Sequence, residues 1–73
     1  MPSKYPTCNS QEVLKVLKKF GFMEVSQKGS HRKLSNGSHI VIIPIHKKDL
    51  KTGTLKSILE QANLTVEEFE RYL

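Results

Sequence analysis

The residues best suited to chemistry lie in one short segment, residues 28–33, which reads Lys-Gly-Ser-His-Arg-Lys. A histidine titrates near neutral pH, so it can accept or donate a proton under physiological conditions. Glycine lets a ligand approach the backbone closely, and cationic side chains hold phosphate groups. We therefore take His31 as the candidate proton-transfer residue. The candidate nucleic-acid contacts are its neighbours Lys28, Gly29, Ser30, Arg32 and Lys33.

RNA is the nucleic acid that fits such a segment best, because its 2′-hydroxyl already lies beside the phosphate to be cleaved. A ribonuclease without a metal needs mainly an acid or a base, and cations that stabilise the developing negative charge. The segment lacks a second acid or base, so a two-histidine mechanism would require His39 or His46. Lys47 and Lys48 follow His46 and would extend the basic surface.

Other chemistries find little support in the sequence. The three histidines show no metal-ligand spacing. Phosphate-binding glycine loops, serine-nucleophile elbows and cysteine–histidine pairs are also missing. The sequence therefore predicts neither a metal nor a cofactor. A lone histidine in a turn is ordinarily a surface side chain, so the case for His31 depends on the elements that present it.

Composition bounds the class of protein. The 73 residues form one domain, 1–73, with 12 Lys and Arg against 7 Asp and Glu and a net charge of +5. That charge favours a polyanionic partner, with nucleic acid first, an anionic membrane surface second and an unspecialised basic surface as the alternative. Cys8 is the only cysteine, which agrees with a reducing cytoplasm. No apolar run is long enough for a signal or a membrane span, so we expect a cytoplasmic protein.

The pattern of elements predicts an α+β fold. Asn9 and Glu12 have capping-box spacing, and a helical apolar stripe then continues to Gly21, which predicts a helix over about 10–20. Three strands are expected over 22–28, 31–35 and 38–45, with turns at Gly29-Ser30 and Asn36-Gly37. Short connections make the strands antiparallel.

Two helices are expected after the strands. The second helix begins at Thr52 or Gly53 and stops near Asn63. Thr65 and Glu68 form another capping-box pattern, which predicts a short last helix through Tyr72.

The third strand carries apolar residues on both faces. Ile40 and Ile42 point one way, whereas Val41, Ile43 and Ile45 point the other. In a simple meander this strand lies at an edge, so one apolar face should be exposed and mark a protein partner or a homodimer contact. The alternative is that the loop after Ile45 folds back and covers that face.

The chain resembles the HicA family of mRNA interferase toxins. The resemblance rests on Gly-Ser-His at 29–31, Ile-Ile-Pro-Ile-His at 42–46 and Leu-Lys-Thr-Gly-Thr-Leu-Lys-Ser-Ile-Leu at 50–59. Glu-Val-Leu at 12–14, Gly-Phe at 21–22 and Glu-Glu-Phe at 67–69 also fit. It covers about residues 9–70, and the combination of these motifs at this spacing is specific.

The resemblance implies a double-stranded-RNA-binding-domain-like α-β-β-β-α fold, with helices on one face of a three-stranded antiparallel sheet. It also implies a type II toxin that cleaves mRNA independently of the ribosome and is inhibited by a HicB antitoxin. The family's catalytic histidine maps onto His31. Leu34 stands where the family often has an aromatic residue, and we expect that position to face the core. The alternatives are a non-catalytic RNA-binding module of the same fold and a protein-interaction domain whose charge serves solubility.

Overall fold

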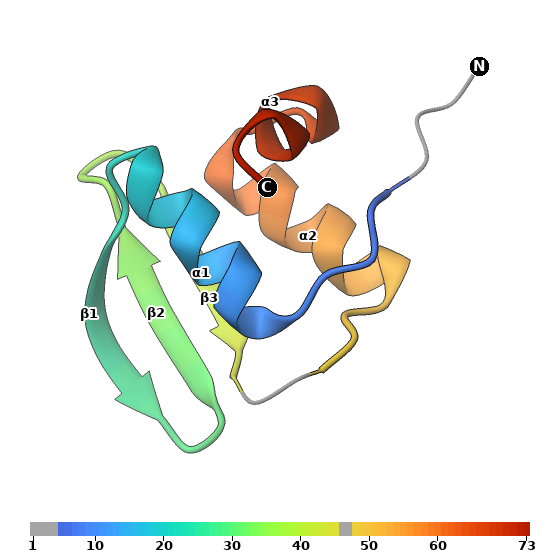
Figure 1. Ribbon diagram of the computed structural model, residues 1–73. Coiled ribbons are helices and arrows are strands. Elements are labelled where there is room, and N and C mark those ends of the chain that lie inside the picture. The colour runs from blue at the N-terminus through green and yellow to red at the C-terminus, as the bar shows by residue number, and fades with distance from the viewer. Residues whose placement is uncertain (1–4, 46–47) are drawn as a thin grey trace.

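A computed structural model describes residues 5–45 and 48–73 of the chain. The elements follow the order α1 (Ser10–Lys19), β1 (Met23–Lys28), β2 (His31–Ser35), β3 (Ile40–Pro44), α2 (Thr52–Ala62) and α3 (Val66–Arg71). The strands form an antiparallel sheet in the order β1-β2-β3 (Figure 1). The predicted α+β fold is therefore confirmed, with α3 as the short extra helix. None of the described helices is long and apolar enough to cross a bilayer.

Local side-chain chemistry sets the helix ends. Asn9 accepts a hydrogen bond from the Glu12 backbone N–H while the Glu12 carboxylate accepts one from the Asn9 N–H, so α1 begins with a complete capping box. Thr65 and Glu68 make the same reciprocal pair at the start of α3. Both predicted capping boxes are confirmed. Left-handed backbone follows α1 at Gly21, with φ +89°, and ends α2 at Asn63, with φ 59°.

The turn between β2 and β3 is longer than the sequence predicts. The Asn36 side-chain oxygen accepts hydrogen bonds from the backbone N–H groups of Ser38 and His39, at 2.9 and 2.7 Å. Those groups are then not available for strand pairing, because local side-chain acceptors compete with the sheet. A four-residue loop results, and β3 begins at Ile40 instead of Ser38.

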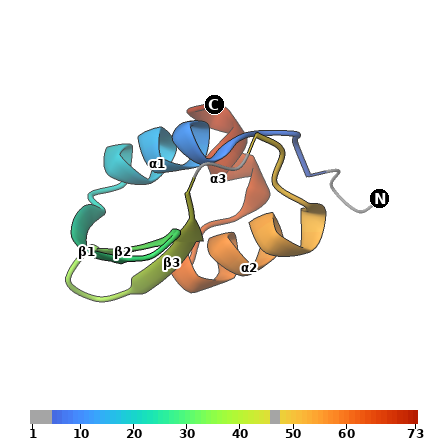
Figure 2. The ribbon, with the colours of Figure 1, turned by 90° about the horizontal axis from the view of Figure 1, so that it is seen from below.

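The core lies on the helix side of the sheet. Leu34 of β2 and Val41 and Ile43 of β3 are fully buried there, and Leu34 faces the core as predicted. Hydrophobic residues of α1, α2 and α3 complete the cluster, and the largest are Leu17, Leu55, Ile58 and Phe69. Figure 2 shows α1 above the sheet and α2 alongside β3.

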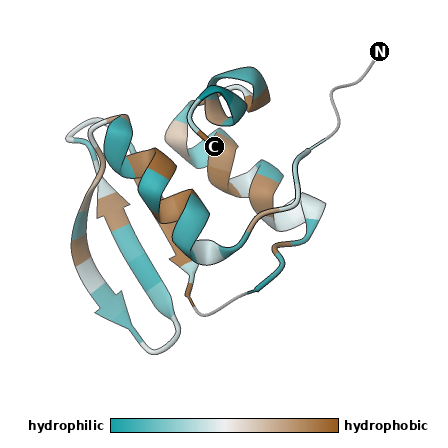
Figure 3. Ribbon diagram, viewed as in Figure 1, coloured by the Kyte–Doolittle hydropathy of each residue, from teal (hydrophilic) through white to brown (hydrophobic). Residues whose placement is uncertain are grey.

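The other side of the sheet remains open. Ile40 and Ile42 are 56% and 42% exposed, which confirms the predicted apolar surface and shows that the described residues after β3 do not cover it. Every residue of β1 is also exposed. Figure 3 shows that the turn end of the β1–β2 hairpin is mainly hydrophilic, in contrast to the apolar stripe on α1. The hairpin therefore extends beyond the core, and polar contacts must hold its tip.

Candidate functional site

His31 is the first residue of β2 and lies exposed at the tip of the hairpin. Its partners in the neighbouring strands are Lys28 of β1 and Pro44 of β3. Lys33 lies two residues further along β2, and alternation places it on the same side as His31. The sequence prediction that His31 and Lys33 share one face is therefore consistent with the observed register.

Pairing places further residues on this side, because directly paired residues of antiparallel strands point the same way. We call it the open face. It consists of Met23, Ser26 and Lys28 of β1, His31, Lys33 and Ser35 of β2, and Ile40, Ile42 and Pro44 of β3. Its charged members are Lys28 and Lys33, so the described residues give the open face a basic character.

A shallow hollow of about 350 Å³ lies beside the imidazole, lined by Ser26, Lys28, His31, Arg32, Lys33 and Ile42. The lining residues carry hydroxyl, ammonium, guanidinium and imidazole groups, together with the aliphatic side chain of Ile42. Among the residues that line it there is no carboxylate and no second imidazole. The lining therefore combines two ammonium groups, which attract anions, with one imidazole, a group that can act as a general acid or base.

The tip of the hairpin is tied to the end of β3. The Ile45 backbone N–H donates to the Ser30 carbonyl at 2.8 Å, next to the Gly29 turn with φ +59°. The buried Ser10 hydroxyl at the start of α1 donates to the Pro44 carbonyl at 2.6 Å. Two segments distant in sequence thus fix the backbone on which His31 stands.

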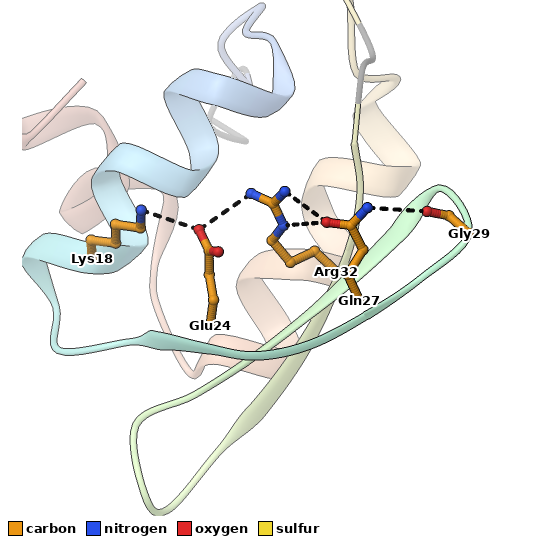
Figure 4. A network of polar contacts seen from close by, with 5 residues as sticks. All are labelled: Lys18, Glu24, Gln27, Gly29 and Arg32. Carbon is orange, nitrogen blue, oxygen red and sulfur yellow. Dashed lines mark hydrogen bonds and ion pairs between the residues drawn. The ribbon is translucent and has the colours of Figure 1, made fainter.

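Arg32 is among the residues that line the hollow, but strand alternation directs its side chain to the helix side of β2, opposite that of His31. Its guanidinium donates to the Gln27 side-chain oxygen from Nε and Nη2, at 3.2 and 2.8 Å, and pairs with the Glu24 carboxylate at 3.2 Å. The Lys18 ammonium of α1 reaches the same carboxylate at 3.1 Å. Gln27 in turn contacts the Gly29 carbonyl at 3.4 Å (Figure 4). We call these five residues the Arg32 network.

The Arg32 network changes the pKa of the Glu24 carboxyl. The hydrogen bond from Lys18, followed by the charge of Arg32, lowers the pKa of this carboxyl below its ordinary value of 4.5. The carboxylate is therefore ionised across the physiological range. It joins α1 to the hairpin through one cation from each.

The structure thus separates the residues that the sequence grouped. Lys28, His31 and Lys33 come together on the open face, whereas the Arg32 guanidinium is engaged with Glu24 and Gln27. Strand alternation alone predicts that the side chains of His31 and Arg32 point to opposite sides of the sheet. Only the folded register, which includes an irregularity between Glu24 and Ser26, reveals the partners.

The other predicted site residues lie elsewhere. Lys48 is exposed in the connection before α2. His46 and Lys47 lie outside the described residues. His39 lies at the opposite end of β2 from His31, half-buried, and its Nδ1 has no hydrogen-bond partner among the described residues. His39 is not among the residues that line the hollow beside His31.

Metal binding and thiol chemistry are two further possibilities to consider for the site. In the part of the chain that the structure describes, no three His, Cys, Asp or Glu side chains come together as a metal site. Burial, assisted by Glu12, raises the pKa of the Cys8 thiol from 9.0 to about 11. Because the thiolate is the reactive form, this cysteine is a weak nucleophile at neutral pH.

Comparison with known protein families gives a match for this chain. The model of the HicA toxin family of bacterial toxin–antitoxin systems matches residues 10–64 of the 73-residue chain. The chain belongs to the HicA toxin family. The match includes α1, the whole sheet and α2, and it ends before α3. A search of curated proteins found no match. Membership of a HicA toxin family implies a toxin role and an antitoxin as partner.

Proposed function

We propose that this HicA-family toxin is a ribonuclease that cleaves mRNA on the open face, with His31 as its proton-transfer residue. The observation that carries the proposal is the position of His31. It stands exposed between Lys28 and Pro44, with Lys33 two residues along the strand, beside a hollow without carboxylates among its lining residues. An anionic substrate can approach this surface without repulsion from the residues around the imidazole.

The chemistry follows from the substrate and from these groups. The RNA 2′-oxygen attacks the adjacent phosphorus and the bond from phosphorus to the 5′-oxygen breaks, which leaves a 2′,3′-cyclic phosphate and a 5′-hydroxyl. The 2′-hydroxyl loses one proton and the departing 5′-oxygen gains one. Neutral His31 can accept the first proton, or protonated His31 can donate the second, while solvent completes the balance. Lys28 and Lys33 stabilise the charge that develops on the phosphoryl oxygens.

In this proposal Arg32 positions the hairpin through its network and does not contact the phosphate. Lys47 and Lys48 extend the basic surface, and the backbone of Gly29 and Ser30 lies beside the phosphate. Because the proposed substrate is mRNA, the reaction takes place in the bacterial cytoplasm. The antitoxin is a HicB-type protein, and it inhibits by keeping RNA away from the open face.

The proposed reaction is tested on the substrate side. Purified protein is incubated in EDTA with a short RNA, and with the same RNA carrying a 2′-deoxynucleotide at the mapped cleavage position. We expect cleavage of the first at that position and none of the second, because the deoxynucleotide lacks the nucleophile. Cleavage of both at the same position would overturn the proposed chemistry.

A non-catalytic RNA-binding module is the second candidate. The absence of a second acid or base among the residues that line the hollow favours it, because general acid–base catalysis is most effective with both proton transfers assisted. The same incubation separates the two candidates. Intact RNA that the protein retains at low salt and releases at high salt would support binding alone.

A further inference from the structure

The open face has an ordered pattern that the proposed catalysis does not use in full. Strand register arranges its residues in three rows across the sheet. They are Lys28–His31–Pro44, then Ser26–Lys33–Ile42, then Met23–Ser35–Ile40. Successive rows lie two residues apart along β2 and β3, which is roughly 7 Å. On β1 the irregularity between Glu24 and Ser26 places Met23 three residues from Ser26. The imidazole belongs to the first row, so the second and third rows extend from it along one direction.

Apolar exposure on this face is concentrated in the second and third rows. Ile42, Ile40 and Met23 are 42%, 56% and 71% exposed. They alternate with hydroxyl groups and with the Lys33 ammonium. The hollow beside His31 includes Ile42, so the aliphatic surface begins next to the catalytic group. A chain with a phosphate at the first row would therefore lay its next groups against apolar side chains.

Charge indicates which occupant fits. The described residues of the open face carry two lysines and no carboxylate. Glu24 lies on the helix side with Lys18 and Arg32. Single-stranded RNA offers both matching chemistries, because its phosphates are anionic and its unpaired bases present flat, weakly polar faces. Bases within a duplex are stacked and paired, so they cannot reach a flat sheet.

We infer that Ile42, together with Ser26 and Lys33, forms a subsite for the unpaired base next to the scissile phosphate, so that the substrate is single-stranded. This inference rests on the proposed function. The base packs against Ile42, and Lys33 and Ser26 donate hydrogen bonds to its edge or to its phosphate. Ile40 and Met23 extend the same apolar surface to the following nucleotide. Aliphatic side chains lack the stacking of aromatic ones, so base preference at this subsite is weak.

The test combines the removal of one side chain, that of Ile42, with the removal of one base from the substrate. The enzyme variants are the wild type, Ile42→Ser, the β-branched Ile42→Thr, and Leu73→Ser. Leu73→Ser is the matched control, because Leu73 is 48% exposed at the chain end and away from the open face. The substrates are one single-stranded RNA and versions with a single abasic residue at each nucleotide flanking the cleaved bond. A duplex of the same sequence is the control for strandedness.

We expect one abasic position to lower kcat/KM by about three- to tenfold for the wild type and Leu73→Ser, as loss of a partly buried apolar contact implies. The same abasic residue should change kcat/KM by less than about twofold for Ile42→Ser, because the partner of the base is already gone. Ile42→Thr should lie between. The duplex should be a poor substrate for every variant.

Measurements of RNA affinity show whether the subsite or the proposed function has failed. Titrations in a His31→Ala background should show the same abasic penalty in Kd, removed by Ile42→Ser. If that penalty is found but the wild type cleaves nothing, the subsite stands and the ribonuclease assignment fails. An equal abasic penalty with and without Ile42, or equal use of duplex RNA, overturns the subsite. Loss of antitoxin inhibition in Ile42→Ser with unchanged RNA kinetics also overturns it, because the surface then serves a protein.

Discussion

Replacing Arg32 separates its two possible roles beside His31, which are binding phosphate and holding the hairpin in place. In the structure its guanidinium makes two hydrogen bonds to Gln27, at 2.8 and 3.2 Å, and an ion pair with Glu24. The Arg32 side chain is only 24% exposed. Arg32→Ala should therefore loosen the hairpin that carries His31, whereas a phosphate-binding arginine would leave the fold unaffected when removed.

The size of the effect follows from those contacts. Hydrogen bonds from a charged donor contribute about 1.5–3 kcal/mol when buried, and the partial exposure of Arg32 reduces their sum to about 1 kcal/mol. For a domain of this size, that loss lowers Tm by about 4–8 °C. Arg32→Lys should lose less, because an ammonium can keep the Glu24 pair but cannot reproduce the fork to Gln27. Lys33→Ala should change Tm little, because Lys33 is exposed.

RNA binding gives the complementary measurement. Each phosphate contact to a single strand contributes about 0.7 to the slope of log Kd against log salt concentration. We expect Lys33→Ala to reduce this slope by about that amount. Arg32→Ala should leave the slope unchanged while it lowers kcat. The reasoning is refuted if Arg32→Ala reduces the slope as Lys33→Ala does and leaves Tm unchanged, because Arg32 would then bind phosphate.

Three further predictions concern groups away from the imidazole. The raised pKa of Cys8, about 11 against 9.0, should slow its reaction with a thiol reagent at pH 8 about 100-fold through thiolate depletion, and unfolding should restore the rate. Ser10→Ala should cost about 1–2 kcal/mol in urea unfolding, because the Pro44 carbonyl loses its donor, whereas Ser57→Ala at an exposed bond should cost less than about 0.5 kcal/mol. Because folding lowers the pKa of Glu24, its ionised carboxylate stabilises the fold at pH values above the ordinary pKa of 4.5. The stability advantage of the wild type over Glu24→Gln should disappear as pH falls through the lowered pKa. An advantage that persists at lower pH would contradict this assignment.

The helices could be predicted from the sequence because the interactions that set their ends are local. Asn9 and Glu12 lie three residues apart, and the side chain of each accepts a hydrogen bond from the backbone N–H of the other, as is also the case for Thr65 and Glu68. The start of β3 could not be predicted in the same way. The Asn36 side chain accepts hydrogen bonds from the backbone N–H groups of Ser38 and His39, two residues that the sequence pattern alone assigns to the strand.

The sequence indicates which residues of the candidate site could do chemistry, but it does not indicate how they are held in place. Alternation placed His31 and Lys33 together. The anchoring of the hairpin depends on contacts between distant positions, such as the bond from Ser10 to Pro44 and the pair of Lys18 with Glu24. Such contacts exist only in the folded register, and a sequence pattern does not encode them. The polar network behind the imidazole therefore appeared only in the structure.

The most direct test of the central claim compares His31→Ala with His39→Ala on one single-stranded RNA in EDTA. His39 is the matched imidazole, because it lies at the other end of β2 and does not line the hollow. We predict that His31→Ala lowers the cleavage rate by about 100-fold or more, as loss of a general acid or base implies, while Kd for RNA changes less than about threefold. His39→Ala should retain nearly full cleavage. Undiminished cleavage by a folded His31→Ala protein would contradict the assignment of His31 as the catalytic residue.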